Sequence, residues 1–390
     1  MAHNSPQLAS RLEQIQPFYA MSLMARAREL QAAGHDIINM GVGEPDFDTP
    51  VPIVDAGITA LQQGAHHYTP ARGLLALREA LSHYYAGRFS VDVAPERILI
   101  TPGSSGALQL LMQCLINPND QVLMTDPGYP CNRNFVRLVE GEAVPIPVDS
   151  RDNFQLNLSL LQQHWGRRSK ALLLASPSNP TGTMVDADEL AAMAAYVKQQ
   201  DGHLFVDEIY QGLSYGVPPQ TALSVSHELF VINSFSKFFG MTGWRLGWLV
   251  APDAYVEALD RIAQNVFLSA PTPAQHAALA AFSPETMDIL EQRREAFQCR
   301  RDYLIAALRS LGFGIDYVPQ GAFYLYANCQ TLTDDSFGFA HRLLEEAGVA
   351  VTPGKDFGSH FPEQHIRFSY TSPLPRLEQA IKRIAGFLKN

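Results

Sequence analysis

Lys237 stands in a setting that is unusual for a lysine. It follows an apolar run at residues 229–233 and lies in the string Ser-Phe-Ser-Lys-Phe-Phe-Gly, among aromatic and small side chains. Surface lysines normally have polar neighbours, whereas burial among apolar groups lowers the pKa of an amine and makes its neutral, nucleophilic form accessible. Lys237 is therefore the first candidate for covalent or acid–base chemistry in this sequence.

Two arginines could hold anions. Arg245 follows Lys237 in a loop rich in glycine and aromatic residues, where a fixed guanidinium could bind a phosphate through two hydrogen bonds. Arg367 lies inside an apolar strand candidate at residues 366–370. A buried arginine needs an anion, which is either a carboxylate of the chain or a bound one. Both side chains are thus candidates for ligand binding as well as for structural ion pairs.

Two polar segments follow apolar runs that are typical of strands. Asp207 and Tyr210 belong to the string Asp-Glu-Ile-Tyr at the end of the run 203–207. An acid there must be paired, because an isolated buried charge is very costly. Its partner is either a helix N-terminus or the cationic nitrogen of a heterocycle. Asn179 lies in Ser-Pro-Ser-Asn-Pro-Thr-Gly after the run 171–175, where a rigid turn could present its amide to a ligand.

The string Thr-Pro-Gly-Ser-Ser-Gly at residues 101–106 follows another apolar run and opens a helical pattern. Backbone N–H groups at a helix N-terminus, beside small residues that allow close approach, form an anion site. Ser104 or Ser105 could also serve as an ordinary N-cap. The two interpretations are compatible.

Apolar runs alternate with helical patterns through the middle of the chain, which predicts a mostly parallel α/β sheet covered by helices on both faces. Ligands of such folds bind beyond the carboxyl ends of the strands. After about residue 270 the pattern changes to long helices and short strands, typical of an α+β domain. We expect an N-terminal segment at 1–45 that packs on the small domain, a large domain at 46–280, and a small domain at 281–390. The expected strands of the large domain are residues 97–101, 121–126, 171–175, 203–207, 229–233 and 246–250. Those of the small domain are residues 322–327, 349–352 and 366–370.

Composition and missing motifs exclude several classes of protein. The chain has 390 residues and a net charge of −10, so no basic excess exists to hold nucleic acid. Its four cysteines are scattered and its 12 histidines show no His-Glu-x-x-His pattern, so we expect no metal and a reducing, cytoplasmic location. No apolar segment approaches the length that spans a bilayer, and we expect no membrane partner. The glycine-rich fingerprints of dinucleotide and nucleotide sites are absent as well.

Four separated strings together resemble a known family. They are the strings around Lys237, Asn179 and Asp207, and Gly-Val-Gly-Glu-Pro-Asp-Phe at residues 41–47. The sequence is similar to the pyridoxal-phosphate (PLP)-dependent aminotransferases of fold type I, the class I/II or aspartate-aminotransferase-like family, from about Arg28 to the C-terminus. The resemblance implies PLP as cofactor. It also implies a PLP-dependent transferase-like α/β fold, with a large domain on a mostly parallel, seven-stranded-type sheet and a smaller α+β domain.

The resemblance assigns catalytic roles to three residues. Lys237 would join the cofactor aldehyde, and Asp207 would keep the pyridine nitrogen protonated. Tyr210 would, together with Asn179, hydrogen-bond the ring hydroxyl oxygen. The reaction implied is transfer of an amino group between an L-α-amino acid and a 2-oxo acid, with ping-pong kinetics.

The remaining cofactor contacts are also implied by the resemblance. Ser234 and Arg245 would bind the cofactor phosphate, which the helix start at Ser104 and Ser105 would receive. Tyr129 would stack on the pyridine ring.

A further tyrosine and two substrate contacts complete the implied site. Tyr68 would reach the phosphate from a partner subunit, which implies a homodimer with shared sites. Gly43 would line the substrate pocket beside Asn179, and Arg367 would clamp the substrate α-carboxylate.

Substrate preference has weaker signals. Residues 264–276, where some relatives hold a cation for acidic substrates, contain no Lys or Arg, and Ser105 stands where others carry Lys. The string Pro17-Phe-Tyr19 could cover an apolar side chain. These features favour neutral or hydrophobic amino acids.

Three alternatives stay open at this point. The first is an aspartate or other acidic-substrate aminotransferase, with Arg26, Arg28 or Arg72 near a distal carboxylate. The second is a PLP-dependent C–S lyase or an aminocyclopropane-carboxylate-synthase-like enzyme, against which the Gly-Trp-Arg string ending at Arg245 argues. The third is a cofactor-sensing regulator, which would need a basic DNA-binding head that this N-terminus lacks.

Overall fold

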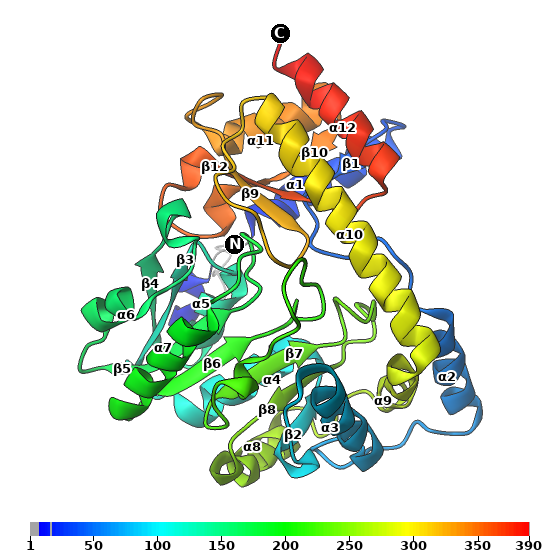
Figure 1. Cartoon of the computed structure of the whole chain (residues 1–390), viewed down its shortest axis with the longest axis vertical. Helices are drawn as coiled ribbons and strands as arrows, with labels where there is room; N and C mark the ends of the chain where they lie inside the picture. The colour runs from blue at the N-terminus through cyan, green and yellow to red at the C-terminus, as the bar shows by residue number, and fades with distance from the viewer. Residues whose placement is uncertain (1–7, 16–17, 390) are drawn as a thin grey trace, which may run out of the picture.

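The structure, a computed structural model, describes residues 8–15 and 18–389. A seven-stranded sheet forms the centre of the larger part of the molecule (Figure 1). All its strands point the same way except β8, which is antiparallel to both of its neighbours. This arrangement confirms the predicted mostly parallel sheet. In spatial order the strands are β2 (Ile98–Thr101), β8 (Gly247–Val250), β7 (Phe230–Ser234), β6 (His203–Asp207), β5 (Ser169–Ala175), β3 (Gln121–Asp126) and β4 (Glu142–Pro147).

Alternate residues of these strands pack into two separate apolar cores. In β5, Leu172 and Leu174 belong to one core and Leu173 to the other, because successive side chains point to opposite faces of a strand. Helices bury both faces, which explains why the strands read as continuous apolar runs. The helices of this part are α2 (Val51–Gln62), α3 (Leu75–Phe89), α4 (Gly103–Leu115), α5 (Pro130–Leu138), α6 (Leu158–His164), α7 (Ala187–Gln199), α8 (Asp253–Val266) and α9 (Thr272–Leu279).

The C-terminal part is built on a small antiparallel sheet with the order β11-β12-β9. The 27-residue helix α10 runs from the large sheet's helices to the far end of this part (Figure 1). The elements here are α10 (Pro284–Ser310), β9 (Tyr324–Asn328), α11 (Ser336–Ala347), β10 (Val349–Ala350), β11 (Thr352–Pro353), β12 (His365–Ser369) and α12 (Leu374–Phe387).

The N-terminal elements lie against the C-terminal part. β1 (Ile38–Asn39) pairs in parallel with β10, and α1 (Tyr19–Ala32) contacts β10 and β11. The division of the chain at residues 45 and 280 stays a prediction.

Two strands differ from the expectation. β4 is missing from the predicted set because Pro145 and Pro147 interrupt its pattern, and prolines are tolerated at a sheet edge, where β4 lies. The predicted strand 349–352 is divided between β10 and β11, which belong to different sheets. A local apolar pattern cannot show such a change of partner.

No helix in the described part of the chain is long and apolar enough to cross a membrane. Within residues 8–15 and 18–389, no group of His, Cys, Asp and Glu side chains is placed to hold a metal ion.

Candidate active site

A cavity of about 310 Å³ lies beyond the carboxyl ends of the parallel strands, between the large sheet and the small C-terminal sheet. Ligands of parallel α/β sheets bind at this edge. The cavity brings together most of the predicted site residues. These are Gly43, Ser104, Ser105, Tyr129, Asn179, Asp207, Tyr210, Lys237, Arg245 and Arg367.

Strand ends position the polar side chains. β6 ends at Asp207, β5 ends at Ala175 before the turn that carries Asn179, and β7 ends at Ser234 shortly before Lys237. Because parallel strands end at one edge of a sheet, residues that are distant in sequence meet there.

Lys237 reaches across the cavity to the N-terminal segment. Its Nζ donates a hydrogen bond of 2.7 Å to the carbonyl oxygen of Gly43. The rings of Tyr210 and Phe323 lie 5.9 and 6.0 Å from Nζ. Burial lowers the pKa of Lys237 to about 8, although the charges of Glu44 and Asp207 partly oppose this. The neutral, nucleophilic form of the amine is therefore far more accessible near neutral pH than in an exposed lysine.

Asp207 is a buried carboxylate at the floor of the cavity. Its Oδ1 accepts the N–H of Ile209 at 3.1 Å. Burial raises the pKa of Asp207 to about 6, while this N–H and the charge of Lys237 lower it. No Lys, Arg or His in the described part of the chain forms a salt bridge with this acid, so a cationic group bound in the cavity would be a suitable partner.

Arg367 lies on β12 and is buried against the large sheet. Its Nη1 donates to Oδ1 of Asn179 at 2.8 Å, and its Nη2 donates to the carbonyl oxygen of Gly41 at 2.6 Å. Among the described residues, no carboxylate pairs with it and its Nε has no hydrogen-bond partner. Neutral oxygens thus orient the guanidinium, and no negative charge balances its positive charge. It is therefore suited to bind the carboxylate of a ligand.

Tyr324 on β9 is a cavity residue that sequence reasoning missed. Its hydroxyl lies 2.8 Å from the hydroxyl of Tyr210, and the guanidinium of Arg367 lies 4.3 Å from the centre of its ring. A Cβ atom on Gly43 would collide with the Tyr324 hydroxyl, so Gly43 permits this close approach. The predicted strand 322–327 contains several aromatic residues, and only the fold shows which one faces the cavity.

The opposite end of the cavity can accept an anion. α4 begins at Gly103, so Ser104 and Ser105 lie in its first turn, and no side chain caps its N-terminus. The N-cap interpretation of these serines is therefore wrong. Arg245 has a positive φ of 53°. Its guanidinium lies next to the helix start, since a Cβ atom added to Gly103 would be only 2.7 Å from Nη2. Free N–H groups and a cation together suit a phosphate.

Two predicted cofactor residues do not line the cavity. Ser234 is buried behind the wall, within 2.9 Å of the Ser236 hydroxyl and 3.1 Å of the Leu246 carbonyl oxygen. Ser236, which no sequence signal singled out, lines the cavity instead. Tyr68 is 81% exposed and lies away from the cavity of its own chain.

Comparison with known proteins decides the family. Residues 35–384 match the model of the family "Aminotransferase class I and II". The valine–pyruvate aminotransferase of Mycobacterium tuberculosis is 36% identical over 96% of this chain and 97% of its own. The aspartate aminotransferase of Bacillus subtilis is 33% identical over 98% and 99%. A solved structure of the Thermus thermophilus aspartate aminotransferase with maleate superposes with a TM-score of 0.92, at 33% identity, over 98% of this chain and 100% of that one.

The chain belongs to the class I and II aminotransferases. This aminotransferase has the fold-type-I architecture and depends on PLP, as its family does. The cavity fits that cofactor. Its helix start and Arg245 suit the phosphate, the carboxylate of Asp207 suits a protonated pyridine nitrogen, and the amine of Lys237 suits the aldehyde.

Three other arginines lie outside the cavity of this aminotransferase. Arg26 pairs with Glu345, and Arg72 lies 3.7 Å from Asp260. None of Arg26, Arg28 and Arg72 lines the cavity. The structure therefore does not support binding of a distal substrate carboxylate by any of the three. Pro17 lies outside the described residues, whereas Phe18 lines the cavity.

We predict that Tyr324→Phe weakens cofactor binding without unfolding the aminotransferase. The variant keeps the ring beside Arg367 but loses the hydrogen bond to Tyr210, worth about 1 kcal/mol or roughly fivefold in affinity. Equilibrium dialysis of PLP and a pH titration of its visible absorption band measure the effect. Tyr317→Phe, which removes a buried hydroxyl that accepts the backbone N–H of Tyr326 on β9, is the control. Wild-type affinity and titration in Tyr324→Phe would show that the hydroxyl has no such role.

Proposed function

We propose that this aminotransferase moves the α-amino group of a neutral or hydrophobic L-amino acid to a 2-oxo acid by a ping-pong mechanism. One observation supports the roles proposed for the individual residues. The amine of Lys237, with its pKa lowered to about 8, shares one cavity with the buried acid Asp207 and the uncompensated cation Arg367.

Lys237 is the proposed proton carrier. Bound PLP supplies an electron sink that makes the substrate Cα proton removable. Because burial lowers the pKa of Lys237 to about 8, its neutral form is far more accessible than that of an exposed lysine. The neutral amine can take that proton and return it, a step typically worth about 10²- to 10⁴-fold in rate. Asp207 would hold the proton on the pyridine nitrogen through a charge-assisted hydrogen bond.

Arg367 and Tyr129 would orient the reacting groups. Arg367 would bind the substrate α-carboxylate through two hydrogen bonds, while its contact with Asn179 aligns the amide that, with Tyr210, holds the ring hydroxyl oxygen. The Tyr129 side chain, at the cavity wall, would stack on the ring.

An apolar wall supports the preference for neutral substrates. Phe18, Met21 and Leu108 line the cavity, and a hydrophobic side chain gains by leaving water against them. No described residue of the segment 264–276 reaches the cavity. Transamination is favoured over C–S lysis because the relatives named above are aminotransferases.

A homodimer with shared sites is the proposed assembly. Tyr68 is the most exposed large apolar side chain of the described chain, and other such side chains lie close to it in sequence on α2 and at the start of α3. Burying this surface against a second copy would remove it from water and bring Tyr68 to the partner's phosphate end. The cytoplasmic location stays a prediction.

We predict that Lys237→Ala abolishes both the visible absorption band of bound PLP and turnover. A panel of amino acids, each paired with pyruvate, 2-oxoglutarate or oxaloacetate, measures the rate and ranks the substrates. Lys237→Arg is the matched control, because it keeps a positive charge but cannot form the covalent bond. A Lys237→Ala enzyme that retains the wild-type rate would contradict the role of this amine.

Hybrid dimers test the role of Tyr68. When Tyr68→Ala subunits are mixed with Lys237→Ala subunits, each hybrid contains one site with both Lys237 and a partner's Tyr68. We therefore predict that mixing and reassembly restore activity that neither variant has alone. If Tyr68 serves the site of its own chain, no hybrid site is complete and mixing restores nothing.

A further inference from the structure

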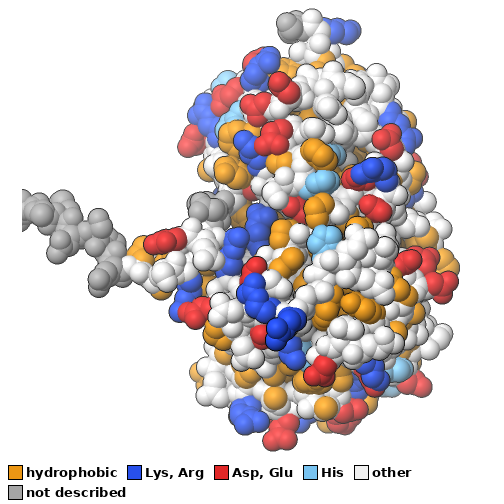
Figure 2. Space-filling view, turned by 90° about the vertical axis from the view of Figure 1, so that its left-hand side faces the viewer, with side chains coloured by type: hydrophobic (Ala, Val, Ile, Leu, Met, Phe, Trp, Pro, Cys, Tyr) orange, Lys and Arg blue, Asp and Glu red, His pale blue; other side chains and the backbone are white. Residues whose placement is uncertain are grey.

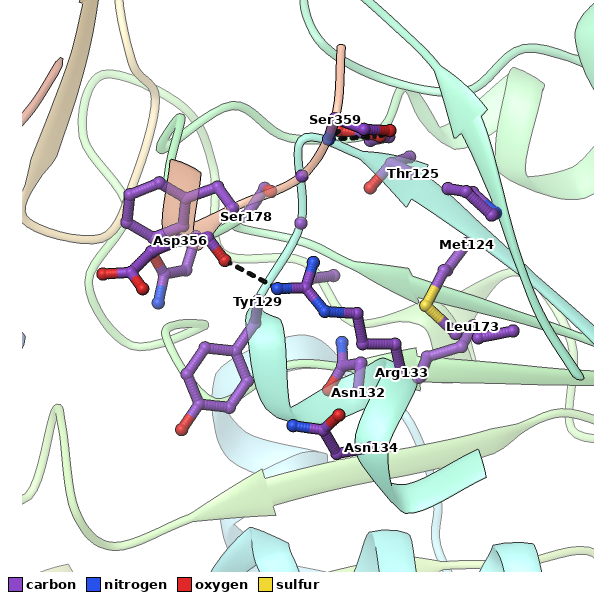
Figure 3. A pocket seen from close by; sticks show the side chains of 18 of the residues that line it. Met124, Thr125, Tyr129, Asn132, Arg133, Asn134, Leu173, Ser178, Asp356 and Ser359 are labelled. Atoms are coloured by element: carbon purple, nitrogen blue, oxygen red, sulfur yellow. Dashed lines mark hydrogen bonds between the residues drawn. The ribbon is translucent and has the colours of Figure 1, made fainter. Parts of the chain in front are cut away.

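Residues 356–360 of the C-terminal part form a segment that contacts several other parts of the molecule. The segment follows β11 and lies against the end of β3 and the helix α5 (Figure 3). Two of its residues, Asp356 and Phe357, also line the cavity that contains Lys237. The segment can therefore influence the active site from the edge of the large sheet.

The carboxylate of Asp356 caps the start of α1. Its Oδ1 accepts the N–H of Tyr19 at 2.7 Å, and its Oδ2 accepts the N–H of Ala20 at 2.6 Å. The N-cap residue of α1 provides no side-chain cap, and the first turn contains no acid. The N–H groups at a helix start need acceptors, and a negative charge there is favourable. A residue 337 positions away in the chain therefore completes the start of α1.

The surroundings of Asp356 favour its charged form. The residue is 3% exposed, and Arg133 of α5 donates to its backbone carbonyl oxygen at 3.1 Å, as Figure 3 shows. Burial raises the pKa of Asp356, whereas the two N–H groups and the charges of Arg367 and Arg133 lower it. Figure 2 shows several Lys and Arg side chains close together on the side of the molecule that carries β4. Nearby positive charges stabilise a buried carboxylate.

The start of α1 forms part of the cavity wall. Phe18, Ala20 and Met21 line the cavity, yet the first fully buried apolar residue of α1 is Leu23. Met21 itself is 60% exposed. Because little apolar burial fixes the residues before Leu23, the position of this wall depends strongly on the hydrogen bonds to Asp356.

Asp126, at the end of β3, attaches the segment to the large sheet. Its Oδ2 accepts the N–H and the hydroxyl of Ser359, both at 2.9 Å. A Cβ atom on Gly358 would collide with this carboxylate, so the close approach requires a glycine. The N–H of Gly128 donates to the carbonyl oxygen of Phe357 at 2.8 Å. These contacts hold the backbone next to Asp356 in place.

The same segment supports Arg367. The guanidinium of Arg367 lies 4.8 Å from the ring centre of Phe357 and 4.3 Å from that of Tyr324. A guanidinium that stacks on aromatic rings is stabilised and has fewer orientations available. One short segment thus connects the apolar wall at α1 with the residue proposed to bind the substrate carboxylate.

We propose that Asp356 is a positioning residue of this aminotransferase, which holds the start of α1 so that Phe18 and Met21 receive the side chain of a hydrophobic substrate. This inference rests on the proposed function, in which that side chain lies against this wall. Without the cap, only a fraction of the molecules has the wall in place, and the apparent dissociation constant rises by the inverse of that fraction. A methyl side chain makes little contact with the wall, so its binding is insensitive to the cap.

The experiment compares Asp356→Asn with the wild-type holoenzyme. Asparagine has the same shape, but its NH₂ group cannot accept an N–H, so the variant loses the charge and at least one capping hydrogen bond. The matched control is Asp335→Asn. Asp335 accepts two N–H groups at the start of α11, at 3.1 and 3.0 Å, but does not line the cavity.

The half-reactions with L-leucine and with L-alanine are followed by the absorption of bound PLP. Their dependence on amino-acid concentration gives the dissociation constant and the maximal rate separately. Thermal unfolding measures the stability of each variant. Ser359→Ala is a second, milder variant, because it removes only one of the hydrogen bonds that hold the segment to Asp126.

We expect Asp356→Asn to raise the dissociation constant for leucine by about fivefold to tenfold, the usual size of a lost helix cap. The constant for alanine and both maximal rates should stay near their wild-type values, because the residues at the reacting atoms are unchanged. Ser359→Ala should shift leucine binding in the same direction by less. Asp335→Asn should lower the unfolding temperature without changing either amino acid's binding.

Equal losses for leucine and alanine would show that Asp356 only supports the fold, and unchanged constants would show that its cap does not set the wall. Either result overturns the proposal and leaves the proposed function standing. If Asp356→Asn does not fold, the leucine and alanine constants of Ser359→Ala decide by the same criteria. A wild-type enzyme that transfers no amino group from either amino acid would instead overturn the proposed function, and this inference with it.

Discussion

The site depends on one desolvated amine. Lys237 lies at the end of a buried strand, its Nζ donates to the Gly43 carbonyl oxygen, and burial lowers its pKa to about 8. That position requires the large sheet, which carries Lys237, and the N-terminal segment, which carries Gly43, to be held together. The pairing of β1 with β10 and the contacts of α1 fix this segment on the C-terminal part. The Thr49 hydroxyl, which donates to the Gly240 carbonyl oxygen and accepts the indole N–H of Trp244, links it to the loop that follows Lys237.

Two hydrogen bonds and a cation–π contact connect Asn179 with Tyr210 through Arg367 and Tyr324. Arg367 contacts Asn179, its guanidinium lies over the ring of Tyr324, and the Tyr324 hydroxyl contacts Tyr210. A ligand carboxylate on Arg367 would therefore act on both side chains proposed to hold the ring hydroxyl oxygen. Arg367 and Tyr324 both lie on the small sheet, and each contacts a residue that follows a strand of the large sheet, Asn179 and Tyr210 respectively.

The sequence alone predicts those site residues that are positioned by the strand immediately before them. Lys237, Asp207 and Asn179 directly follow apolar strands, so their place at the carboxyl edge follows from the alternating pattern alone. Tyr324 could not be found in this way, because a strand pattern does not show which of several aromatic side chains will face the cavity. β4 escaped prediction for a different reason, since its edge position tolerates two prolines.

The most direct test is to identify the atom that carries the cofactor. Borohydride treatment of the native holoenzyme, followed by digestion and mass spectrometry, fixes the pyridoxyl group to the amine that binds it. We predict a single modified peptide, labelled at Lys237. A label on another lysine, or no label on enzyme that contains PLP, would contradict the account.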